Sequence, residues 1–144
     1  MKDGSMSATS ATTGPVADRP DVEIRLPADG AYVSVLRTTT AGLAARLDFT
    51  IDDIEDLRIA VGEACAMVLP EADEVSDLTG QFHLRPGQLT VSVAVTATEP
   101  SAPDYDSFAW QVLTTLADSA TVGTSEGRFV VTMVMHPTAL GEGR

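Results

Sequence analysis

The segment from Thr50 to Leu69, TIDDIEDLRIAVGEACAMVL, constrains the fold more than any other part of the chain. Its apolar residues recur three and four positions apart, which predicts an amphipathic helix. Thr50 and Asp53 stand at the spacing of a capping box, so the helix should begin directly after Thr50. The face expected to meet a core carries Ile54, Leu57, Val61, Ala64, Cys65 and Val68.

The second half of this helix is apolar except for Glu63 and the weakly ionisable Cys65. Glu63 shares a stripe with Ile59 and Met67, four residues to either side, so its carboxylate should point where Met67 points. A carboxylate within an apolar helix is costly unless something pairs with it, which marks Glu63 as a candidate functional residue. The alternative is a partly exposed glutamate at the rim of the core.

Acidic residues crowd the first turns of the same helix. Carboxylates at a helix N-terminus interact favourably with the helix dipole, and this explains the cluster without any function. A metal site is the alternative, but one helical turn presents such side chains in different directions. His83 and His136 are far apart and have no cysteine at ligand spacing, so zinc is not expected either. The cluster consists of Asp52, Asp53, Glu55 and Asp56.

The rest of the chain alternates between strand-like and helix-like patterns, and no internal repeat is present. The expected order is strand, two helices, two strands, one helix and two strands. Helices on one face of a mostly antiparallel sheet would give an α+β fold, a two-layer α/β sandwich. The expected ranges are 22–26, 31–47, 50–69, 78–84, 88–96, 106–117, 120–124 and 128–135, with Arg85-Pro86-Gly87 as a hairpin turn.

The first and third helices each have one predicted core face. In the first helix, which Asp29 should cap, Val33, Leu36, Thr40, Leu43, Ala44 and Leu47 form this face and Arg37 falls outside it. In the third helix, Asp106 should be the cap and Trp110 should lie off the core. The inward residues there would be Phe108, Val112, Leu113 and Leu116.

Composition narrows the classes of function. The formal net charge is −12 and the pI is about 4.3, so direct binding to nucleic acid or to anionic lipid is not expected. The lone Cys65 excludes an intrachain disulfide and suits the reducing cytoplasm. No membrane span and no signal peptide are predicted. The expected organisation is a disordered tail over 1–20, one domain over 21–136 and a frayed tail over 137–144.

Several motifs resemble those of a known family. The stretch L-R-I-A-V-G-E-A-C, with V-E-I-R-L-P-A and Y-V-S-V-L-R-T before it, is similar to the RsbW-type anti-sigma factors. These belong to the histidine-kinase-like (GHKL) ATPase superfamily, and the resemblance implies that fold over roughly Val22 to Met135. The later stretch D-S-F-A-W-Q-V-L-T-T-L-A-D-S-A looks most like actinobacterial members that hold a stress-response sigma factor.

The resemblance implies a nucleotide site that has lost most of its parts. In the family a glutamate helps to activate a phosphate acceptor, and Glu63 matches it. The magnesium-binding asparagine is replaced by Met67, and a thioether is a poor ligand for a hard cation. The Asp-x-Gly motif that recognises adenine falls on Val95, Thr96 and Ala97. No glycine lies between Gly87 and Gly123, so a glycine-rich lid is absent and no cofactor is expected.

Two functions remain open under this resemblance. The first is an anti-sigma factor that sequesters a sigma factor by surface contact and is released by an anti-sigma factor antagonist. The second is an active serine kinase that uses Mg-ATP, with Glu63 as base, to phosphorylate the antagonist. A third possibility is an old ATP pocket that holds another ligand.

The family also suggests where partners would bind. An arginine on the first helix contacts the sigma factor and the antagonist in these proteins, and Arg37 matches that position. Its small neighbours Ser34, Thr38 and Ala41 would let a partner approach closely, although an ordinary solvated arginine is the simpler interpretation. Family members form homodimers through the first strand and helix, and the strand at 22–26 is edge-like.

Overall fold

The computed structural model of the chain describes residues 19–138. The predicted tails, 1–20 and 137–144, therefore lie outside the described residues, except for residues 19, 20, 137 and 138. Within the described part, no helix is long and apolar enough to cross a lipid bilayer.

The predicted order of elements is confirmed. Short 3₁₀ turns at Gly30–Tyr32 and Leu69–Glu71 adjoin the first two helices. The helices are α2 (Val33–Arg46), α3 (Ile51–Val68) and α4 (Phe108–Leu116). The strands are β2 (Val22–Pro27), β3 (Asp77–Arg85), β4 (Gln88–Thr96), β5 (Ser119–Gly123) and β6 (Arg128–Met135).

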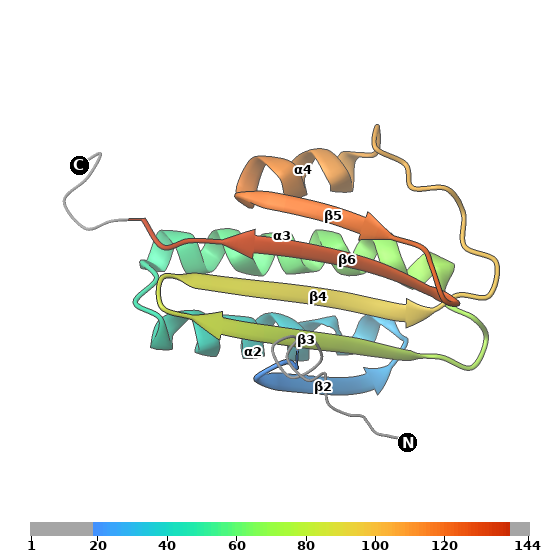
Figure 1. Ribbon diagram of the computed structural model, residues 1–144, viewed down its shortest axis with the longest axis horizontal. Helices are drawn as coiled ribbons and strands as arrows, with labels where there is room; N and C mark the ends of the chain where they lie inside the picture. Colours follow the sequence, from blue (N-terminus) through green and yellow to red (C-terminus); the bar gives the residue numbers. More distant parts are fainter. Residues whose placement is uncertain (1–18, 139–144) are drawn as a thin grey trace, which may run out of the picture.

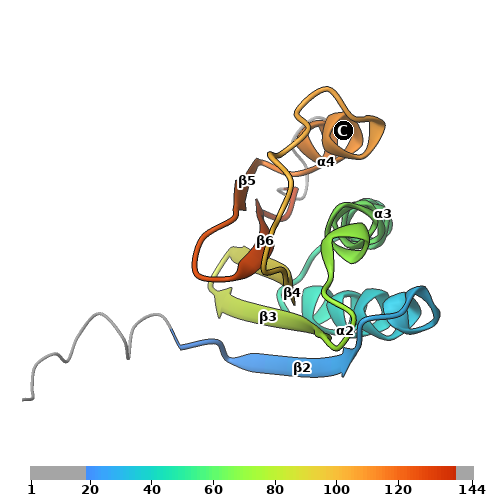
Figure 2. The ribbon, with the colours of Figure 1, turned by 90° about the vertical axis from the view of Figure 1, so that its right-hand side faces the viewer.

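The strands form one antiparallel sheet in the order β2-β3-β4-β6-β5, so β2 and β5 are its two edges. All three helices cover the same face of this sheet, and the opposite face is open (Figures 1 and 2). The predicted α+β two-layer sandwich is thereby confirmed, and it is consistent with the GHKL-type fold that the resemblance implied. Burial alternates along β3 and β4. It shows that even-numbered residues of β3 and odd-numbered residues of β4 face the helices.

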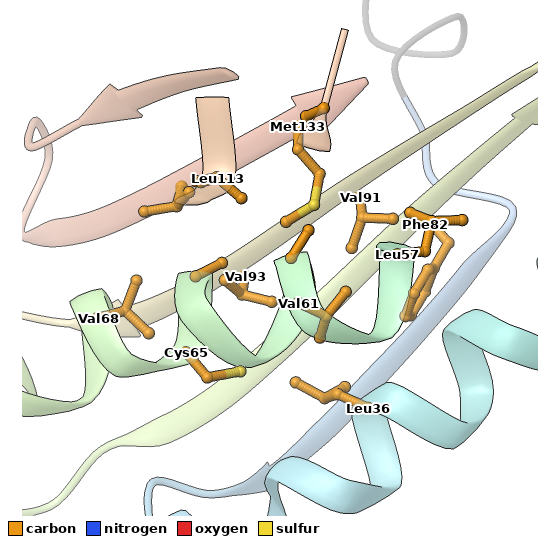
Figure 3. Close-up of a cluster of buried hydrophobic side chains, with 14 of the residues drawn as sticks. Leu36, Leu57, Val61, Cys65, Val68, Phe82, Val91, Val93, Leu113 and Met133 are labelled. Atoms are coloured by element: carbon orange, nitrogen blue, oxygen red, sulfur yellow. The ribbon is translucent and has the colours of Figure 1, made fainter. Parts of the chain in front are cut away.

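The core lies between the helices and the sheet, with α3 at its centre (Figure 3). Leu57, Val61, Ala64, Cys65 and Val68 are completely buried, as the periodicity of this helix predicted, whereas Ile54 is half-buried. Close approach between α2 and β3 depends on Gly80. A Cβ atom at that position would lie 2.7 Å from Leu36 Cδ2, too close for a buried side chain without room to move.

Two local predictions from turn and cap chemistry are confirmed. The Thr50 side chain accepts a hydrogen bond from the Asp53 amide, and the Asp53 carboxylate accepts one from the Thr50 amide, which completes the capping box. The β3–β4 hairpin turns through Pro86 and Gly87, with Gly87 at φ +71°. Proline followed by a glycine of positive φ is typical of a type II turn.

Asp53 also fastens the end of the described chain to the start of α3. Its carboxylate accepts hydrogen bonds of 2.8 Å from both the amide and the hydroxyl of Thr138. Desolvation raises the pKa of Asp53, but the hydrogen bonds from Thr138 and Thr50 outweigh it and lower the pKa below its ordinary value.

The predictions for the third helix need correction. Its cap is Ser107, whose side chain accepts from the Trp110 amide, and Asp106 lies outside the helix. Phe108 was expected to face inward but is 74% exposed. Trp110 was expected off the core but packs against it, edge-to-face with Tyr105 at 5.2 Å between ring centroids. Leu113 is buried, as predicted.

Candidate functional site

A cleft of about 290 Å³ lies where the end of α3 meets the loop that connects β4 to α4. This size is just below the range of roughly 300–1,000 Å³ in which small-molecule sites usually fall. Residues from α3, from the connecting loop, from the start of α4 and from β6 line it: Ala66, Met67, Pro70, Glu71, Ser101, Ala102, Asp104, Ser107, Ala109 and Phe129.

Met67 and Glu63 have different places relative to this cleft. Met67, which the resemblance matches to the family's asparagine, is half-buried and lines the cleft. Glu63, one helical turn earlier, is also half-buried but is not among the lining residues. Within residues 19–138 the Glu63 carboxylate makes no hydrogen bond and no ion pair. Glu63 therefore lies at the rim of the core, beside Ile59, which is 46% exposed.

The positions matched to the adenine-binding motif belong to the core. Val95 is 2% exposed and Ala97 is completely buried, and neither is among the residues that line the cleft. The Ala97 amide donates a hydrogen bond of 2.8 Å to the Gly127 carbonyl, which ties the end of β4 to the turn before β6. No polar side chain at these two positions is available to recognise a base.

Carboxylates hold the loop between β4 and α4 in place. The Asp73 carboxylate accepts hydrogen bonds from the Thr98 amide at 3.0 Å and from the Thr98 hydroxyl at 2.6 Å. Glu71 Oε1 accepts from the Ser101 amide at 2.8 Å. These bonds fasten the segment before α4, which the resemblance matches to the family's glycine-rich lid. Both hydrogen bonds from Thr98 lower the pKa of Asp73, so the carboxylate stays ionised at neutral pH.

The charges around the cleft are negative. Glu71 and Asp104 are its two ionisable lining residues, and no lysine, arginine or histidine is among the residues that line it. A triphosphate placed here would meet like charge and no cation. Both carboxylates are already engaged, Glu71 with Ser101 and Asp104 with the Asp106 amide. With the thioether of Met67 in the asparagine position, this donor set does not suit Mg-ATP.

The acidic start of α3 has a structural explanation. Asp53 completes the capping box and holds Thr138, and Asp52 shares the first turn of the helix. Among residues 19–138, no three histidine, cysteine, aspartate or glutamate side chains come together in a group that could hold a metal ion.

Arg37 does not stand on an open face, contrary to the sequence-based expectation. It is half-buried in the seam between α2 and α3, where a Cβ atom at Gly62 would lie 3.9 Å from Arg37 Cδ. The absence of a side chain at Gly62 leaves room for the arginine stem. Burial raises the pKa of the neighbouring Cys65 thiol to about 12, and the charge of Arg37 acts in the opposite direction.

The hydrogen-bonding capacity of Arg37 is not fully used in this position. Its Nε atom is buried and has no hydrogen-bond acceptor within the described part of the chain. Such a donor is uncommon in folded proteins because its lost hydration is not replaced. Of the predicted neighbours, Ser34 and Thr38 are exposed and Ala41 is half-buried. The four residues share one side of α2, and none of them is among the residues that line the cleft.

Sequence reasoning missed the residues that tie the loop after β4 to the segment after α3. Glu71 and Asp73 belong to no motif, and their partners Ser101 and Thr98 lie 30 and 25 residues further along the chain. No spacing rule connects residues so far apart. The only available signal was the absence of glycine from the connecting loop, which makes a mobile lid less plausible.

Comparison with known proteins supports the resemblance over half of the chain. The chain is 40% identical over 75 residues to the serine-protein kinase RsbW of Bacillus cereus, a match that covers 51% of this chain and 47% of the relative. Proteins of the same name from Bacillus mycoides and Bacillus thuringiensis are 39% identical over the same length. The chain thus spans about half the length of the curated relatives it matches. No protein-family profile matches it.

Proposed function

We propose that this relative of the RsbW serine-protein kinases is an anti-sigma factor that works by binding alone. It would sequester an alternative, stress-response sigma factor in the cytoplasm, and an anti-sigma factor antagonist would release it. The nucleotide site would be a remnant, with Glu63 a vestige of the catalytic machinery. The observation that carries this proposal is the chemistry of the cleft. Met67, Glu71 and Asp104 line it, and no lysine, arginine or histidine is among the lining residues.

The fixed loop supports the same proposal. A kinase of this type needs a lid that closes over phosphates, and glycine supplies the backbone freedom and close approach that this requires. Here the corresponding segment has no glycine and is bonded to Glu71 and Asp73. Function resides in sites rather than folds, so a retained fold with a lost site is compatible with a binding role.

Arg37 supports a protein partner on the α2 side. Its buried Nε has no acceptor, and the planar guanidinium is well suited to carboxylates. A partner's acidic side chain would pair with the solvent-accessible part of the half-buried guanidinium, with Ser34 and Thr38 exposed beside it. The buried Nε would gain an acceptor only if the arginine turned outward on binding. This arrangement fits the sigma factor and the antagonist as alternative occupants of one surface.

One observation favours the alternative, an active serine kinase that phosphorylates the antagonist with Mg-ATP. The relatives named as serine-protein kinases are about 40% identical over the matched half. Glu63, on α3, is the residue that the resemblance matches to the family's glutamate. Against this, Glu63 is not among the residues that line the cleft.

Calorimetric titration with each alternative sigma factor of the source organism tests the proposal. We expect one of them to bind, with the same dissociation constant in the presence and absence of Mg-ATP. Incubation with the antagonist and labelled ATP should transfer no phosphate. If no sigma factor binds, the anti-sigma role is wrong. If phosphate is transferred, or if sigma binding requires Mg-ATP, the kinase alternative is correct.

A further inference from the structure

Helix α4 is apolar on more than the side that faces the core. Leu113 is buried and Trp110 packs against the core from the inner side. The outer side carries a shallow groove of about 270 Å³. Its lining residues are uncharged and recur three and four positions apart, so they share one face of the helix. They are Phe108, Gln111, Val112, Thr115 and Leu116.

This groove exposes a large aromatic side chain. Phe108 is 74% exposed, and Tyr105, shortly before it in the chain, is 54% exposed. Aromatic side chains are enriched at protein interfaces relative to the rest of the surface, and an exposed apolar patch marks a docking site. The groove shares no residue with the cleft at Met67, and Arg37 is not among its lining residues. It is therefore a separate surface.

The chain around the groove is acidic. Residues 86–127 include no lysine, arginine or histidine and five acidic residues: Glu99, Asp104, Asp106, Asp118 and Glu126. Asp104 and Asp106 precede α4 and Asp118 follows it, so carboxylates stand beyond both ends of the helix. Within residues 19–138 no arginine forms an ion pair with any of these three. An apolar groove with negative ends is the result.

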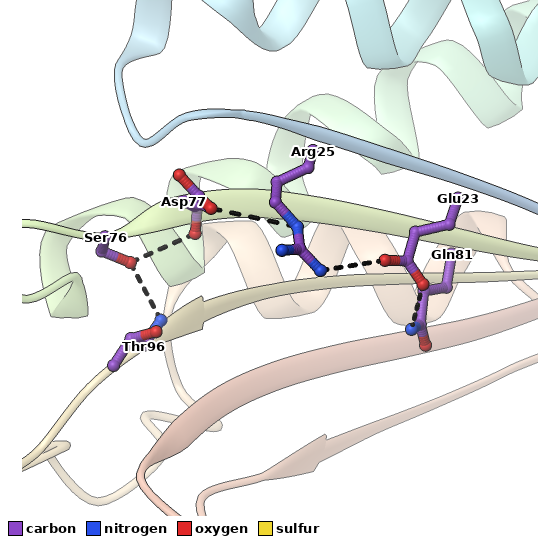
Figure 4. Close-up of polar contacts among 6 residues, drawn as sticks. All are labelled: Glu23, Arg25, Ser76, Asp77, Gln81 and Thr96. Atoms are coloured by element: carbon purple, nitrogen blue, oxygen red, sulfur yellow. Dashed lines mark hydrogen bonds and ion pairs between the residues drawn. The ribbon is translucent and has the colours of Figure 1, made fainter.

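A cleft on the open face of the sheet has no such bias in charge. It measures about 390 Å³, and its charged lining residues are two carboxylates and two arginines, Glu23, Asp77, Arg25 and Arg128. Arg25 lies between Glu23 and Asp77, at nitrogen–oxygen distances of 3.2 Å and 3.9 Å (Figure 4). Because these charges offset one another, that face does not select a partner by charge, whereas the α4 groove does.

We propose that the α4 groove docks a basic amphipathic helix of another protein. Apolar residues at i, i+4 and i+7 of the partner helix would enter the groove and cover Phe108. Lysine and arginine side chains on the flanks of that helix would meet Asp106 at one end and Asp118 at the other. Helix α4 has nine residues and is about 14 Å long, so three such anchors span it.

Charge and size disfavour other occupants. The groove is open and falls below the range of roughly 300–1,000 Å³ that is usual for small-molecule sites. Its acidic ends would repel an anionic lipid surface. A second copy of the chain would bring the same acidic ends and its own charge of −12. The inference depends neither on ATP binding nor on what binds beside Arg37.

A designed peptide tests the groove directly. The probe is a fluorescein-labelled helical peptide of about 15 residues, with leucine at i, i+3, i+4 and i+7 and lysine elsewhere. Fluorescence anisotropy should show saturable binding to the parent chain. A second peptide, with glutamate in place of every lysine, should not bind. Phe108→Ser should weaken binding of the lysine peptide at least about tenfold, because it removes the apolar contact. Ile51→Ser is the control, since Ile51 is 79% exposed beside the acidic start of α3, and should bind like the parent.

A pair of charge variants separates the groove from the net charge of the chain. Asp106→Asn and Glu55→Gln each remove one carboxylate from an exposed position, so both lower the net negative charge by the same amount. Asp106→Asn should weaken binding of the lysine peptide several-fold, and Glu55→Gln should leave it unchanged. Both variants keep the exposed positions polar, so their circular dichroism spectra should match the parent.

Several results would overturn the proposal. One is the absence of saturable binding to the parent, and another is equal binding by the parent and Phe108→Ser. A loss confined to Ile51→Ser or Glu55→Gln would place the peptide at the start of α3 instead. Binding to phosphatidylglycerol vesicles that Phe108→Ser abolishes would assign the groove to a lipid surface. A parent dimer that Phe108→Ser dissociates would assign it to a second copy of the chain, and either outcome contradicts a basic helix as the occupant.

Discussion

The carboxylate of Asp73 holds Thr98 by two hydrogen bonds, from the amide at 3.0 Å and from the hydroxyl at 2.6 Å. Asp73 follows the end of α3 and Thr98 opens the loop to α4, so the pair joins these two segments of the chain. The Asp73 amide adds a bond of 2.8 Å to the Thr96 carbonyl. The segment that the resemblance matches to the family's lid is thus fastened at its first residues.

Removing this carboxylate should loosen the loop without unfolding the domain. In Asp73→Ala the Thr98 amide and hydroxyl lose their acceptors, so amide hydrogen exchange over residues 98–107 should become several-fold faster. Exchange in the core strands should stay the same because Asp73 lies outside the core. Glu74→Ala, at an exposed neighbouring position, is the control and should exchange like the parent. Unchanged exchange in Asp73→Ala would mean that other contacts hold the loop.

The same contact predicts a dependence on acid. Thr98 lowers the pKa of Asp73 in the folded protein, so the interaction contributes fully at pH values above the ordinary aspartate pKa of about 3.9. It is lost as the pH falls through the lowered value. The Thr98 amide resonance should therefore stay constant between neutral pH and about pH 5 and shift only in more acidic solution. A titration centred near pH 6 would exclude Asp73 as the controlling group.

Gly80 should be intolerant of any side chain. Gly80→Ala would place Cβ 2.7 Å from Leu36 Cδ2 and 3.4 Å from Phe82 Cε1, and both neighbours are completely buried. Overpacking of this kind should lower the free energy of unfolding by about 1–3 kcal/mol, measured by urea denaturation. Gly42→Ala is the matched control within α2, where nothing lies within 4 Å. It should raise stability by about 0.5–1 kcal/mol because alanine is the better helix former.

Arg37 should contribute to partner binding through its guanidinium and to folding through its stem. Arg37→Met keeps an unbranched stem beside Gly62 and removes the buried Nε that lacks an acceptor, so the free energy of unfolding should not fall. Affinity for the sigma factor should weaken by about 2 kcal/mol, roughly thirtyfold, in calorimetric titration.

Two further variants complete this test. Arg37→Ala should lose both binding and some stability, because its packing against α3 is removed as well. Arg46→Met, at the exposed end of the same helix, should bind sigma like the parent. Normal binding by Arg37→Met together with weak binding by Arg46→Met would place the partner on another part of α2.

Local chemistry made most of the fold predictable. The capping box of Thr50 and Asp53 is encoded within four residues, and the hairpin at Pro86-Gly87 within two. The long apolar period of α3 identified its core face for the same reason. Helix α4 has only nine residues and is apolar on more than one side, so periodicity could not decide between Phe108 and Trp110. Contact with Tyr105 and the core decides it in favour of Trp110.

The candidate site was less predictable because its decisive contacts are non-local. The resemblance matches Met67 to the family's asparagine, and the structure places Met67 among the residues that line the cleft. The half-burial of Arg37 depends on Gly62 in another helix, and the bond between Asp73 and Thr98 spans 25 residues. Neither relationship has a signature in either segment alone.

Isothermal titration with Mg-ATP is the most direct test of the proposal that the nucleotide site is degraded. A cleft lined by Met67, Glu71 and Asp104, with no cation among its lining residues, should give no binding heat at millimolar nucleotide. Met67→Asn should also give none, because restoring one ligand leaves the core positions Val95 and Ala97 and the fastened loop unchanged. A micromolar dissociation constant for the parent chain would contradict this account and restore Glu63 as a candidate catalytic base.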